Sequence, residues 1–514
     1  MGACNPAPRA LRSAGQRRLR PVDENLASGR FRGGSPAIRL DKLLRGAHVL
    51  DILGDPGGLD VSAVTFDTRD VTPGALHCCL PGAHFDGHDF AHQAVRAGAV
   101  ALLCERILPP EVVPARVVQA CVGAGGARPA MAEVAATFWG RPADSLRMVG
   151  VTGTSGKTTV VHLLGAVLEA HGWPTAVLGT LGGARTTPEA PVLQEALACH
   201  RRTGGVAVAM EVSSHAMVAH RVDAIRYDVA AFTNLSHDHL DFHPDMEAYF
   251  EAKASLFSPE RADVGLANLD DAWGARLMGL AKIPMAGFSV SEVTELHLGP
   301  ATSRFRWRGN TVSLALGGVF NVSNAVAAAR IADALGVPAP TIAEGLSALR
   351  GIPGRFEAVE RGQPFTVVVD YAHKPDALSQ LLSAVRQGIG PASRLIVVFG
   401  CGGDRDRAKR PVMGEVATRL ADLAVLTSDN PRSEDPAAII AEVEAGVPAK
   451  EALVVEADRA VAIALAIGAA APGDAVVIAG KGHESGQESA AGNINFDDRR
   501  VAAEAIDRRM GAAT

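Results

Sequence analysis

Short apolar runs alternate with longer amphipathic stretches along the chain from about residue 61 onward. Apolar runs bounded by polar or glycine positions are typical of buried parallel strands, and the stretches between them have the spacing of helices. The pattern therefore predicts an α/β protein built on parallel sheets. The predicted strands are Val61–Phe66, Ala99–Leu103, Val117–Val122, Leu146–Val151, Thr175–Leu178, Val206–Glu211, Asp228–Phe232, Asp263–Ala267, Thr366–Asp370, Leu395–Phe399, Leu423–Thr427, Leu453–Glu456 and Ala475–Ala479.

Two glycine- and proline-containing stretches, Gly123–Pro129 and Gly351–Gly354, separate blocks of this pattern and are predicted linkers. A chain of 514 residues has room for about three domains. The predicted division is a disordered tail at 1–40, a small N-terminal α/β domain at 41–125, a central parallel-sheet domain at 126–353 and a C-terminal doubly wound, Rossmann-like domain at 354–514.

Composition narrows the class of protein. A net charge of -6 gives no electrostatic footprint for nucleic acid, and no apolar run approaches the ~20 residues of a membrane span. Seven cysteines without zinc spacing indicate a reduced, cytosolic protein. The first 40 residues hold eight arginines and only two acids, which fits a transit peptide or a disordered tail, and the composition favours the tail.

A Gly-Thr-Ser-Gly-Lys-Thr-Thr run at 153–159 stands between the predicted strand Leu146–Val151 and the predicted helix Val160–Ala170. Backbone N–H groups of a glycine loop and a helix N-terminus bind phosphate, and the lysine adds a positive charge. Val151 stands where the usual Gly-x-x-x-x-Gly-Lys pattern has its first glycine. A glycine turn before an ordinary helix is the alternative, but the strand–loop–helix order favours a nucleotide phosphate loop.

Three further stretches of the central part carry side chains suited to chemistry. Glu211 ends a predicted strand, where a carboxylate either holds Mg²⁺ or simply faces solvent. Residues 234–243 contain three histidines and two aspartates, which indicates a metal or phosphate site unless they form a self-satisfied polar loop. Lys253 lies in an apolar helical stretch, where burial would make its amine nucleophilic, although its sequence context alone favours a surface lysine.

Three polar loops follow strands of the predicted C-terminal domain and should meet at one edge of its sheet. Arg405 and Arg432 can clamp a carboxylate through paired N–H groups, and Glu484 can bind an ammonium group. Each loop alone is compatible with a glycine turn, but together they predict a pocket for an amino acid. The loops are Gly400–Asp406, Asp429–Arg432 and Gly480–Glu484.

Together these motifs resemble the Mur ligase family, the ATP-dependent enzymes that build the stem peptide of peptidoglycan. The resemblance runs from about Val61 to Asp497 and is strongest to the members that add the third amino acid. It rests on Gly-Thr-Ser-Gly-Lys-Thr-Thr at 153–159, Thr-Thr-Pro-Glu at 186–189, Glu-Val-Ser-Ser-His at 211–215, Asp-His-Leu-Asp at 238–241, Glu-Ala-Lys at 251–253, Asp-Tyr-Ala-His at 370–373 and Asp-Asn-Pro-Arg at 429–432.

The resemblance implies a set of site residues. ATP is expected to contact Gly153, Thr154, Ser155, Gly156, Lys157, Thr158, Thr159, Asn321, Arg355, Asp370 and His373. A UDP-N-acetylmuramoyl peptide is expected to contact Thr68, Arg69, Thr186, Thr187, Ser213 and Arg221. The incoming amino acid is expected to contact Arg405, Asp429, Asn430, Pro431, Arg432, Gly480 and Glu484. The catalytic residues would be Lys157, Glu211, His239 and Lys253, and Mg²⁺ would be held by Thr158, Glu211, His239 and Lys253, with Lys253 carbamylated by CO₂.

The resemblance also implies a reaction. ATP would phosphorylate the D-glutamate carboxylate of a UDP-N-acetylmuramoyl dipeptide, and the amine of meso-diaminopimelate would attack the acyl phosphate. The Asp-Asn-Pro-Arg form of the 429–432 loop resembles diaminopimelate-adding members rather than L-lysine-adding ones. The protein would be a cytoplasmic monomer that binds no nucleic acid and spans no membrane.

Two departures from the family pattern bear on the acceptor. The segment Leu178–Thr186 is shorter than in relatives, and Ala219 stands where many of them have glutamine. They leave open a lysine-adding or secondary-pathway ligase. A folate-type ligase is a further alternative, against which the 211–215 and 429–432 motifs speak. A nucleotide-binding regulator without catalysis is the third, against which the intact Lys157, Glu211, His239 and Lys253 speak.

Overall fold

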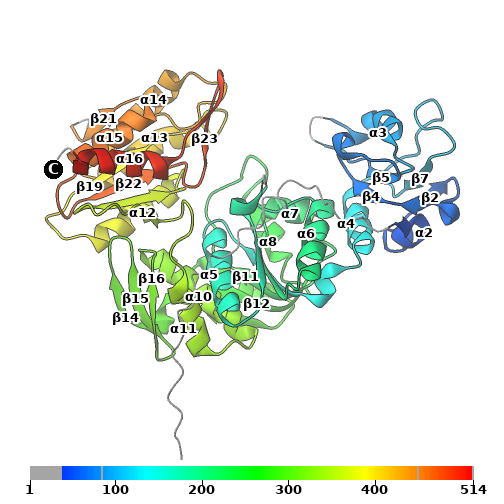
Figure 1. Ribbon diagram of the computed structural model, residues 1–514, viewed down its shortest axis with the longest axis horizontal. Coiled ribbons are helices and arrows are strands. Elements are labelled where there is room, and N and C mark those ends of the chain that lie inside the picture. The colour runs from blue at the N-terminus through cyan, green and yellow to red at the C-terminus, as the bar shows by residue number, and fades with distance from the viewer. Residues whose placement is uncertain (1–36, 83–84, 184, 449–450, 512–514) are drawn as a thin grey trace, which may run out of the picture.

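The computed structural model describes residues 37–82, 85–183, 185–448 and 451–511, which form three α/β domains (Figure 1). The N-terminal domain lies at one end, the central domain in the middle and the C-terminal domain at the other end. Parallel strands dominate all three large sheets, so the predicted α/β class is confirmed. Within the described ranges, no helix is long and apolar enough to cross a membrane.

The N-terminal domain comprises β1 (Ile38–Arg39), α2 (Leu40–Leu43), β2 (Asp51–Leu53), β3 (Asp60–Val61), β4 (Ala63–Thr65), β5 (Ala75–Cys78), α3 (Ala91–Ala97), β6 (Ala101–Cys104), β7 (Val118–Cys121) and α4 (Ala127–Phe138). Its five-stranded sheet has the order β2-β7-β6-β5-β4, with only the edge strand β2 antiparallel to its neighbour.

The start of the described chain is already part of this domain. Ile38 and Arg39 pair with β3, and Leu40 is fully buried in the core against α4. Of the predicted tail at 1–40, residues 1–36 lie outside the described residues. The helix α4 begins at Ala127, so the predicted linker Gly123–Pro129 is a turn followed by the first turn of a helix.

The central domain comprises β8 (Arg147–Thr152), α5 (Lys157–Ala170), β9 (Thr175–Leu178), α6 (Ala190–Arg202), β10 (Ala207–Glu211), α7 (Ser214–Val218), β11 (Tyr227–Phe232), α8 (Met246–Ala254), β12 (Ala262–Asn268), α9 (Ala272–Leu280), β13 (Met285–Phe288), β14 (Val293–Leu298), β15 (Ser303–Trp307), β16 (Asn310–Leu314), α10 (Val319–Ala334) and α11 (Ala339–Ala348). Its parallel sheet has the order β13-β12-β11-β8-β10-β9.

Helices bury both faces of this sheet. Neighbouring side chains of a strand point to opposite faces and therefore pack in different cores. Val149 of β8 packs in a core with α5 and α10, whereas Met148 packs in a second core with α6 and α8. The strand order reverses at β8, since the chain adds β9 and β10 on one side and β11 to β13 on the other. Ligands of open α/β sheets bind at such a switch point, so the loops after β8 and β11 flank the expected site.

A small antiparallel sheet of β14, β15 and β16 follows β13 and was not predicted. Ser303, Phe305 and Trp307 point into the core, and Arg304 and Arg306 point outward. This strict alternation is typical of a strand with one buried face, and it contains no continuous apolar run.

The C-terminal domain comprises β17 (Glu357–Ala358), β18 (Thr366–Asp370), α12 (Pro375–Gly388), β19 (Leu395–Phe399), α13 (Lys409–Leu420), β20 (Leu423–Leu426), α14 (Pro436–Glu444), β21 (Leu453–Val455), α15 (Arg459–Ala469), β22 (Ala475–Ala479), β23 (Gly486–Ser489), β24 (Gly492–Asn495) and α16 (Asp498–Gly511). Its sheet has the order β17-β18-β22-β19-β20-β21 and is parallel except for β17.

Helices cover both faces of this sheet, so the predicted doubly wound arrangement is confirmed. Val397 of β19 packs in one core with α12 to α14, and its neighbour Ile396 packs in another with α15 and α16. The hairpin of β23 and β24 extends beyond the sheet and was not predicted.

Candidate active site

The phosphate loop joins β8 to α5 and is braced by the end of β11. Gly153 has a φ of +144°, and a Cβ there would lie 1.9 Å from Thr233 Oγ1, so only glycine fits. Thr233 Oγ1 donates to the Ser155 carbonyl at 2.7 Å, and Asn234 Oδ1 accepts from Ser155 N at 2.9 Å. Neither Thr233 nor Asn234 was predicted as a site residue, although both hold the loop in its shape.

Lys157 and Thr158 begin α5 and face the interior of the site. Lys157 Nζ donates to the carbonyls of Gly153 at 2.7 Å and Thr154 at 2.9 Å. Burial lowers the pKa of Lys157 to about 8, although the Glu211 carboxylate acts in the opposite direction. Thr158 Oγ1 donates to Glu211 Oε1 at 2.9 Å, so the predicted hydroxyl and carboxylate are in direct contact.

Lys253 is buried beneath the same loop, which makes its interpretation as a surface lysine wrong. It is 1% exposed, and its Nζ donates to the Gly153 carbonyl at 2.8 Å and lies 4.5 Å from the Tyr249 ring centroid. Burial lowers the pKa of Lys253 well below its usual value, and the positive charge of Lys157 adds to this effect. Both effects favour the neutral, nucleophilic form of the amine.

His239 lies at the same edge, in the loop after β11, with a φ of +53° that is unusual for a residue other than glycine. Its Nε2 is 3.0 Å from Asp238 Oδ2. Burial lowers the pKa of His239 to about 4, so the imidazole is neutral near pH 7. Asp238 belongs to the Asp-His-Leu-Asp motif at 238–241, but its contact with His239 was not predicted.

The histidine-rich run 234–243 does not assemble a metal site by itself. In the part of the chain that the structure describes, no three His, Cys, Asp or Glu side chains are arranged to hold a metal ion. His243 Nε2 is instead bonded to Ser214 Oγ at 2.9 Å. Mg²⁺ is usually bound through one or two carboxylates together with phosphate oxygens and water, and the pair Thr158 and Glu211 fits that requirement.

The C-terminal domain contributes to the nucleotide site through Arg355 and the end of β18. Arg355 donates to Thr158 Oγ1 at 3.4 Å, and its guanidinium lies 4.6 Å from the Tyr371 ring centroid. Asp370 accepts hydrogen bonds from the backbone N–H groups of Phe356 and Ala372, and burial raises its pKa. Two domains therefore meet over the phosphate loop.

Two predicted nucleotide contacts lie further from the loop. His373 is bonded to the Tyr371 carbonyl at 2.8 Å, and burial lowers its pKa to about 3. Asn321 donates to Gly317 O at 2.9 Å within the first turn of α10. Asn324, one turn later, approaches the loop directly, because a Cβ on Gly156 would lie 2.4 Å from its Oδ1.

Four of the residues predicted to contact the muramoyl peptide lie together beside Glu211. Thr187 Oγ1 donates to the Glu211 carbonyl at 2.9 Å and lies 3.4 Å from Ser213 Oγ. Arg221 donates to Thr187 O at 3.2 Å, and Thr186 Oγ1 is 3.1 Å from Thr180 Oγ1. The other two, Thr68 and Arg69, lie on the N-terminal domain, where Arg69 makes a forked contact with Asp67.

The three C-terminal loops converge as predicted. Asn430 Nδ2 donates to Glu484 Oε2 at 2.8 Å, and the fully buried Lys481 donates to Asn430 Oδ1 at 2.8 Å and to Glu484 Oε2 at 3.2 Å. Gly480 leaves room for the adjacent aspartate, because a Cβ there would lie 2.7 Å from Asp429 Oδ2. Lys481 therefore holds in place Asn430 and Glu484, two side chains expected to contact the amino acid.

The guanidinium of Arg432 lies on the rim of this region and already has partners. Its Nε donates to Glu488 Oε2 at 3.1 Å and its Nη1 to Gly403 O at 2.8 Å. Arg432 is therefore half-buried and paired with protein groups before any substrate binds. Arg405, its predicted companion, donates to the carbonyl of Asp404 and is exposed.

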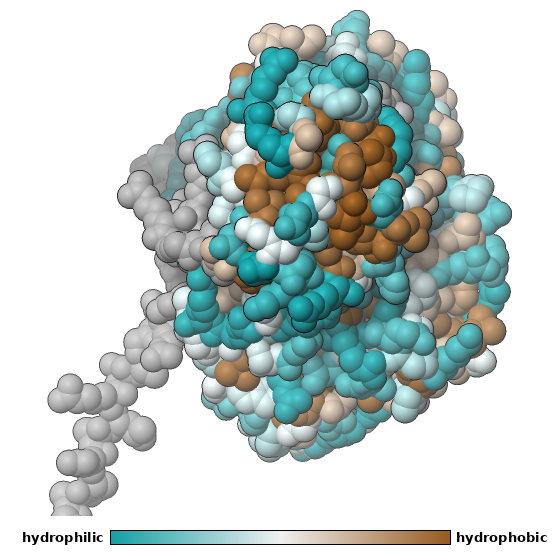
Figure 2. All heavy atoms as spheres, turned by 90° about the vertical axis from the view of Figure 1, so that its right-hand side faces the viewer, coloured by the Kyte–Doolittle hydropathy of each residue, from teal (hydrophilic) through white to brown (hydrophobic). Residues whose placement is uncertain are grey.

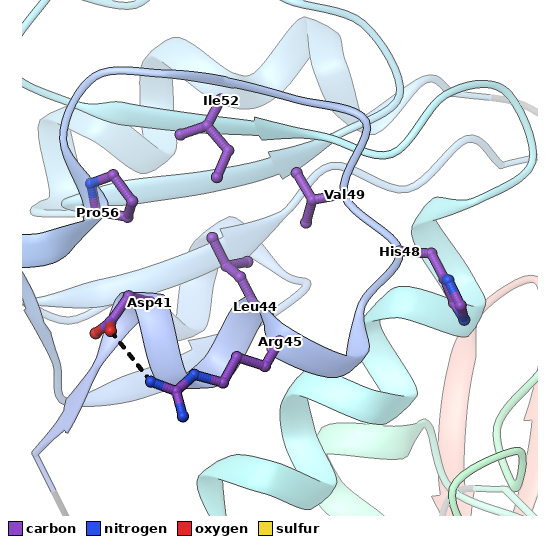
Figure 3. A pocket seen from close by; sticks show the side chains of 7 residues that line it. All are labelled: Asp41, Leu44, Arg45, His48, Val49, Ile52 and Pro56. Carbon is purple, nitrogen blue, oxygen red and sulfur yellow. Dashed lines mark ion pairs between the residues drawn. The ribbon is translucent and has the colours of Figure 1, made fainter.

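A separate apolar surface lies on the N-terminal domain, where Figure 2 shows hydrophobic side chains gathered on one face. Leu50 and Leu53 are 76% and 50% exposed there. A hollow of about 350 Å³ lies between α2 and β2 and contains none of the predicted site residues (Figure 3). Its lining residues are Asp41, Leu44, Arg45, His48, Val49, Ile52 and Pro56.

Three family models match the chain in order. They are described as the Mur ligase family catalytic domain (residues 60–138), the Mur ligase middle domain (151–332) and the Mur ligase glutamate ligase domain (354–482).

Individual relatives match over most of the chain. The UDP-N-acetylmuramoyl-L-alanyl-D-glutamate--2,6-diaminopimelate ligase of Streptomyces coelicolor is 44% identical over 90% of this chain and 96% of its own. The protein of the same name from Syntrophomonas wolfei is 42% identical over 91% and 99%. A solved structure with that name shares 31% identity and a TM-score of 0.66 over 92% of this chain and 100% of that one. The chain belongs to the Mur ligase family.

Proposed function

We propose that this protein is the ATP-dependent ligase that joins meso-diaminopimelate to UDP-N-acetylmuramoyl-L-alanyl-D-glutamate through an acyl phosphate, releasing ADP and phosphate. The observation that carries the proposal is 44% identity, over nine-tenths of the chain, to a ligase named for this reaction. The positions of the phosphate loop, Glu211 and Lys253 support the same reaction.

The protein's part in the first step is to hold negative charge in place. Backbone N–H groups of the loop and of the first turn of α5 point toward the bound phosphates. Lys157 is positioned to exchange its carbonyl partners, Gly153 and Thr154, for phosphate oxygens. Preorganised charge of this kind stabilises a transferring phosphoryl group without further rearrangement.

Thr158, Glu211, His239 and the carbamate of Lys253 are the residues that would hold Mg²⁺. Bound Mg²⁺ would neutralise charge on the phosphate oxygens during transfer. The Glu211 carboxylate is 1% exposed and is fixed by hydrogen bonds from Thr158 Oγ1 and Thr180 N, both at 2.9 Å. Its position is therefore set before any ligand arrives.

Carbamylation of Lys253 follows from its burial. The neutral amine attacks the carbon of CO₂, an N–C bond forms, and one N–H proton is released to solvent. The product is a carboxylate, so a negative charge replaces the neutral amine. A buried ammonium at this position, with the Gly153 carbonyl as its hydrogen-bond acceptor, would be costly, which favours the neutral, reactive form.

Separate groups of residues would hold the two substrates. Thr186, Thr187, Ser213 and Arg221 would hold the muramoyl peptide so that its D-glutamate carboxylate reaches the phosphate. Asp429, Asn430, Arg432 and Glu484 would hold diaminopimelate, with Arg432 on its far carboxylate. We place the enzyme in the cytoplasm, where ATP and nucleotide sugars are made, and propose that it acts as a monomer.

The test is ligation by the purified protein of each candidate amino acid. The reaction contains ATP, Mg²⁺ and UDP-N-acetylmuramoyl-L-alanyl-D-glutamate, and product is measured by mass spectrometry with meso-diaminopimelate or L-lysine. A diaminopimelate adduct with one ADP per product supports the proposal. ATP hydrolysis that does not respond to the dipeptide would point to a different acceptor, and activity on a folate with glutamate would point to a folate-type ligase.

A further inference from the structure

One side chain of the C-terminal domain reaches into the phosphate site and has no assigned role. Lys374 follows the Asp-Tyr-Ala-His motif and immediately precedes α12. Its Nζ donates to Asp238 Oδ2 of the central domain, 136 residues earlier in the chain. This ion pair links the domain that carries the amino-acid loops to the domain that carries the phosphate loop.

Asp238 is satisfied without this lysine. Its Oδ1 accepts from His239 N at 2.9 Å, and its Oδ2 lies 3.0 Å from His239 Nε2. The remaining partner of Oδ2 is the Lys374 ammonium, so the carboxylate pairs with a cation of the opposite domain.

The other cations near the loop are held more tightly. Lys157 and Lys253 are both bonded to the Gly153 carbonyl, and Lys253 is 1% exposed. Arg355 lies between the Tyr371 ring and Thr158. Lys374 has one carboxylate partner, 29% of its side chain is exposed, and its flexible stem carries a compact point charge. It is the cation best able to change partners when phosphate arrives.

We infer that Lys374 is a further catalytic residue of the phosphoryl transfer, delivered by the C-terminal domain, and that Asp238 is its partner in the absence of substrates. In the loaded enzyme the ammonium moves from Asp238 to an oxygen of the transferring phosphoryl group. This inference rests on the proposed ligase activity and adds a residue to it.

The step is balanced without a proton transfer. The bond between the γ-phosphorus and the oxygen that leaves with ADP breaks, and a bond between that phosphorus and a carboxylate oxygen of the substrate forms. Lys374 stays protonated throughout and stabilises charge on the phosphoryl oxygens. Its movement also draws the C-terminal domain toward the acyl phosphate, where the amine must attack.

The test isolates this half-reaction. Wild-type enzyme, Lys374→Met and Lys374→Arg are mixed with ATP carrying a radioactive γ-phosphate and the muramoyl dipeptide, without amino acid, and labelled acyl phosphate is followed by rapid quench. Loss of one charge-stabilising donor typically slows such a step by about 100-fold, which is the expected effect of Lys374→Met. Lys374→Arg should recover part of the rate, and the Kd for ATP should be unchanged. Lys282→Met, which removes an exposed lysine elsewhere in the central domain, is the matched control.

A double-mutant cycle separates contact with phosphate from a structural role. If Lys374 contacts the phosphoryl group, Lys374→Met slows the reaction to a similar extent in the Asp238→Asn background. A cost that disappears in that background would mean that Lys374 acts only by holding Asp238, and a wild-type rate for Lys374→Met would also overturn the inference. Failure of the wild-type enzyme to form any labelled acyl phosphate would instead refute the proposed function.

Discussion

Replacing Arg432 by alanine should raise the KM for diaminopimelate by about 10- to 100-fold and leave the KM for ATP unchanged. The backbone around Arg432 fixes the direction of its side chain. Arg432 has a φ of +53°, and its backbone N–H donates to Glu488 O at 3.1 Å. A hydrogen bond to a charged group contributes roughly 1.5–3 kcal/mol. Since about 1.4 kcal/mol corresponds to a tenfold change in binding, the loss of the contact to the far carboxylate gives the stated range.

Discrimination against L-lysine should be smaller than a buried and otherwise unpaired arginine would give. A site that leaves a buried polar group unpaired rejects the wrong substrate by ~10⁴-fold. Arg432, however, keeps Glu488 as a partner at 3.1 Å when lysine binds, so its charge is not left unpaired. We therefore expect discrimination nearer ~10²-fold, which is one charge-assisted contact. Glu488→Gln removes the alternative partner and should increase the preference for diaminopimelate.

The assay is steady-state ligation of each amino acid at saturating ATP and muramoyl dipeptide. Arg407→Ala is the matched control, because Arg407 lies in the neighbouring loop region, is exposed and pairs with Glu442 instead. Equal KM values for diaminopimelate in the wild type and Arg432→Ala would refute the assignment of Arg432. Equal use of lysine and diaminopimelate by the wild type would refute the specificity argument as a whole.

Substitutions at three other positions and the deletion of one segment give further testable predictions. Lys157→Ala should abolish ligation while the circular dichroism spectrum stays unchanged, and near-normal turnover at saturating ATP would remove the phosphate-loop assignment. Lys253→Ala should be almost inactive and partly rescued by acetate, and the wild type should lose activity when CO₂ is stripped; full activity of the variant would contradict carbamylation. Arg459→Met leaves the fully buried Asp498 without its partner and should destabilise the C-terminal domain by about 3–5 kcal/mol, measured by hydrogen exchange of α15 and α16, and Arg459→Met/Asp498→Leu should recover most of the loss. Deleting residues 1–36 should leave kcat and the midpoint of thermal unfolding unchanged, whereas extending the deletion through Arg39 removes β1 and should lower that midpoint.

The parts of the fold that could be predicted are the strands with continuous apolar runs. The bounds of β9, β18, β19 and β22 agree with the predicted strands because continuous apolar runs mark them unambiguously. The antiparallel β14–β16 sheet was missed because polar residues interrupt its apolar positions, and the β23–β24 hairpin was missed because it has no buried apolar face. Alternation within a short segment is a weaker signal than a continuous run.

The candidate site also contains residues that the sequence could predict and residues that it could not. The phosphate loop, Glu211 and the three C-terminal loops could be predicted because each is a local sequence pattern at the end of a strand. Thr233, Asn324 and Lys374 could not, because their importance comes from contacts with residues far away in the chain. Lys253 shows the limit most clearly, since only the folded structure brings its amine under the Gly153 carbonyl and makes it buried.

The nucleotide site is a joint product of two domains, and this changes how variants must be interpreted. Arg355 contacts Thr158 and Lys374 contacts Asp238, so the C-terminal domain also brings positive charge to the proposed phosphate site. A substitution in the C-terminal domain that alters its approach can therefore slow acyl phosphate formation, which takes place before the amino acid reacts. Binding of diaminopimelate to the same domain favours whichever arrangement it contacts best. Because such coupling is reciprocal, ATP and the muramoyl dipeptide should in turn tighten diaminopimelate binding by the same factor.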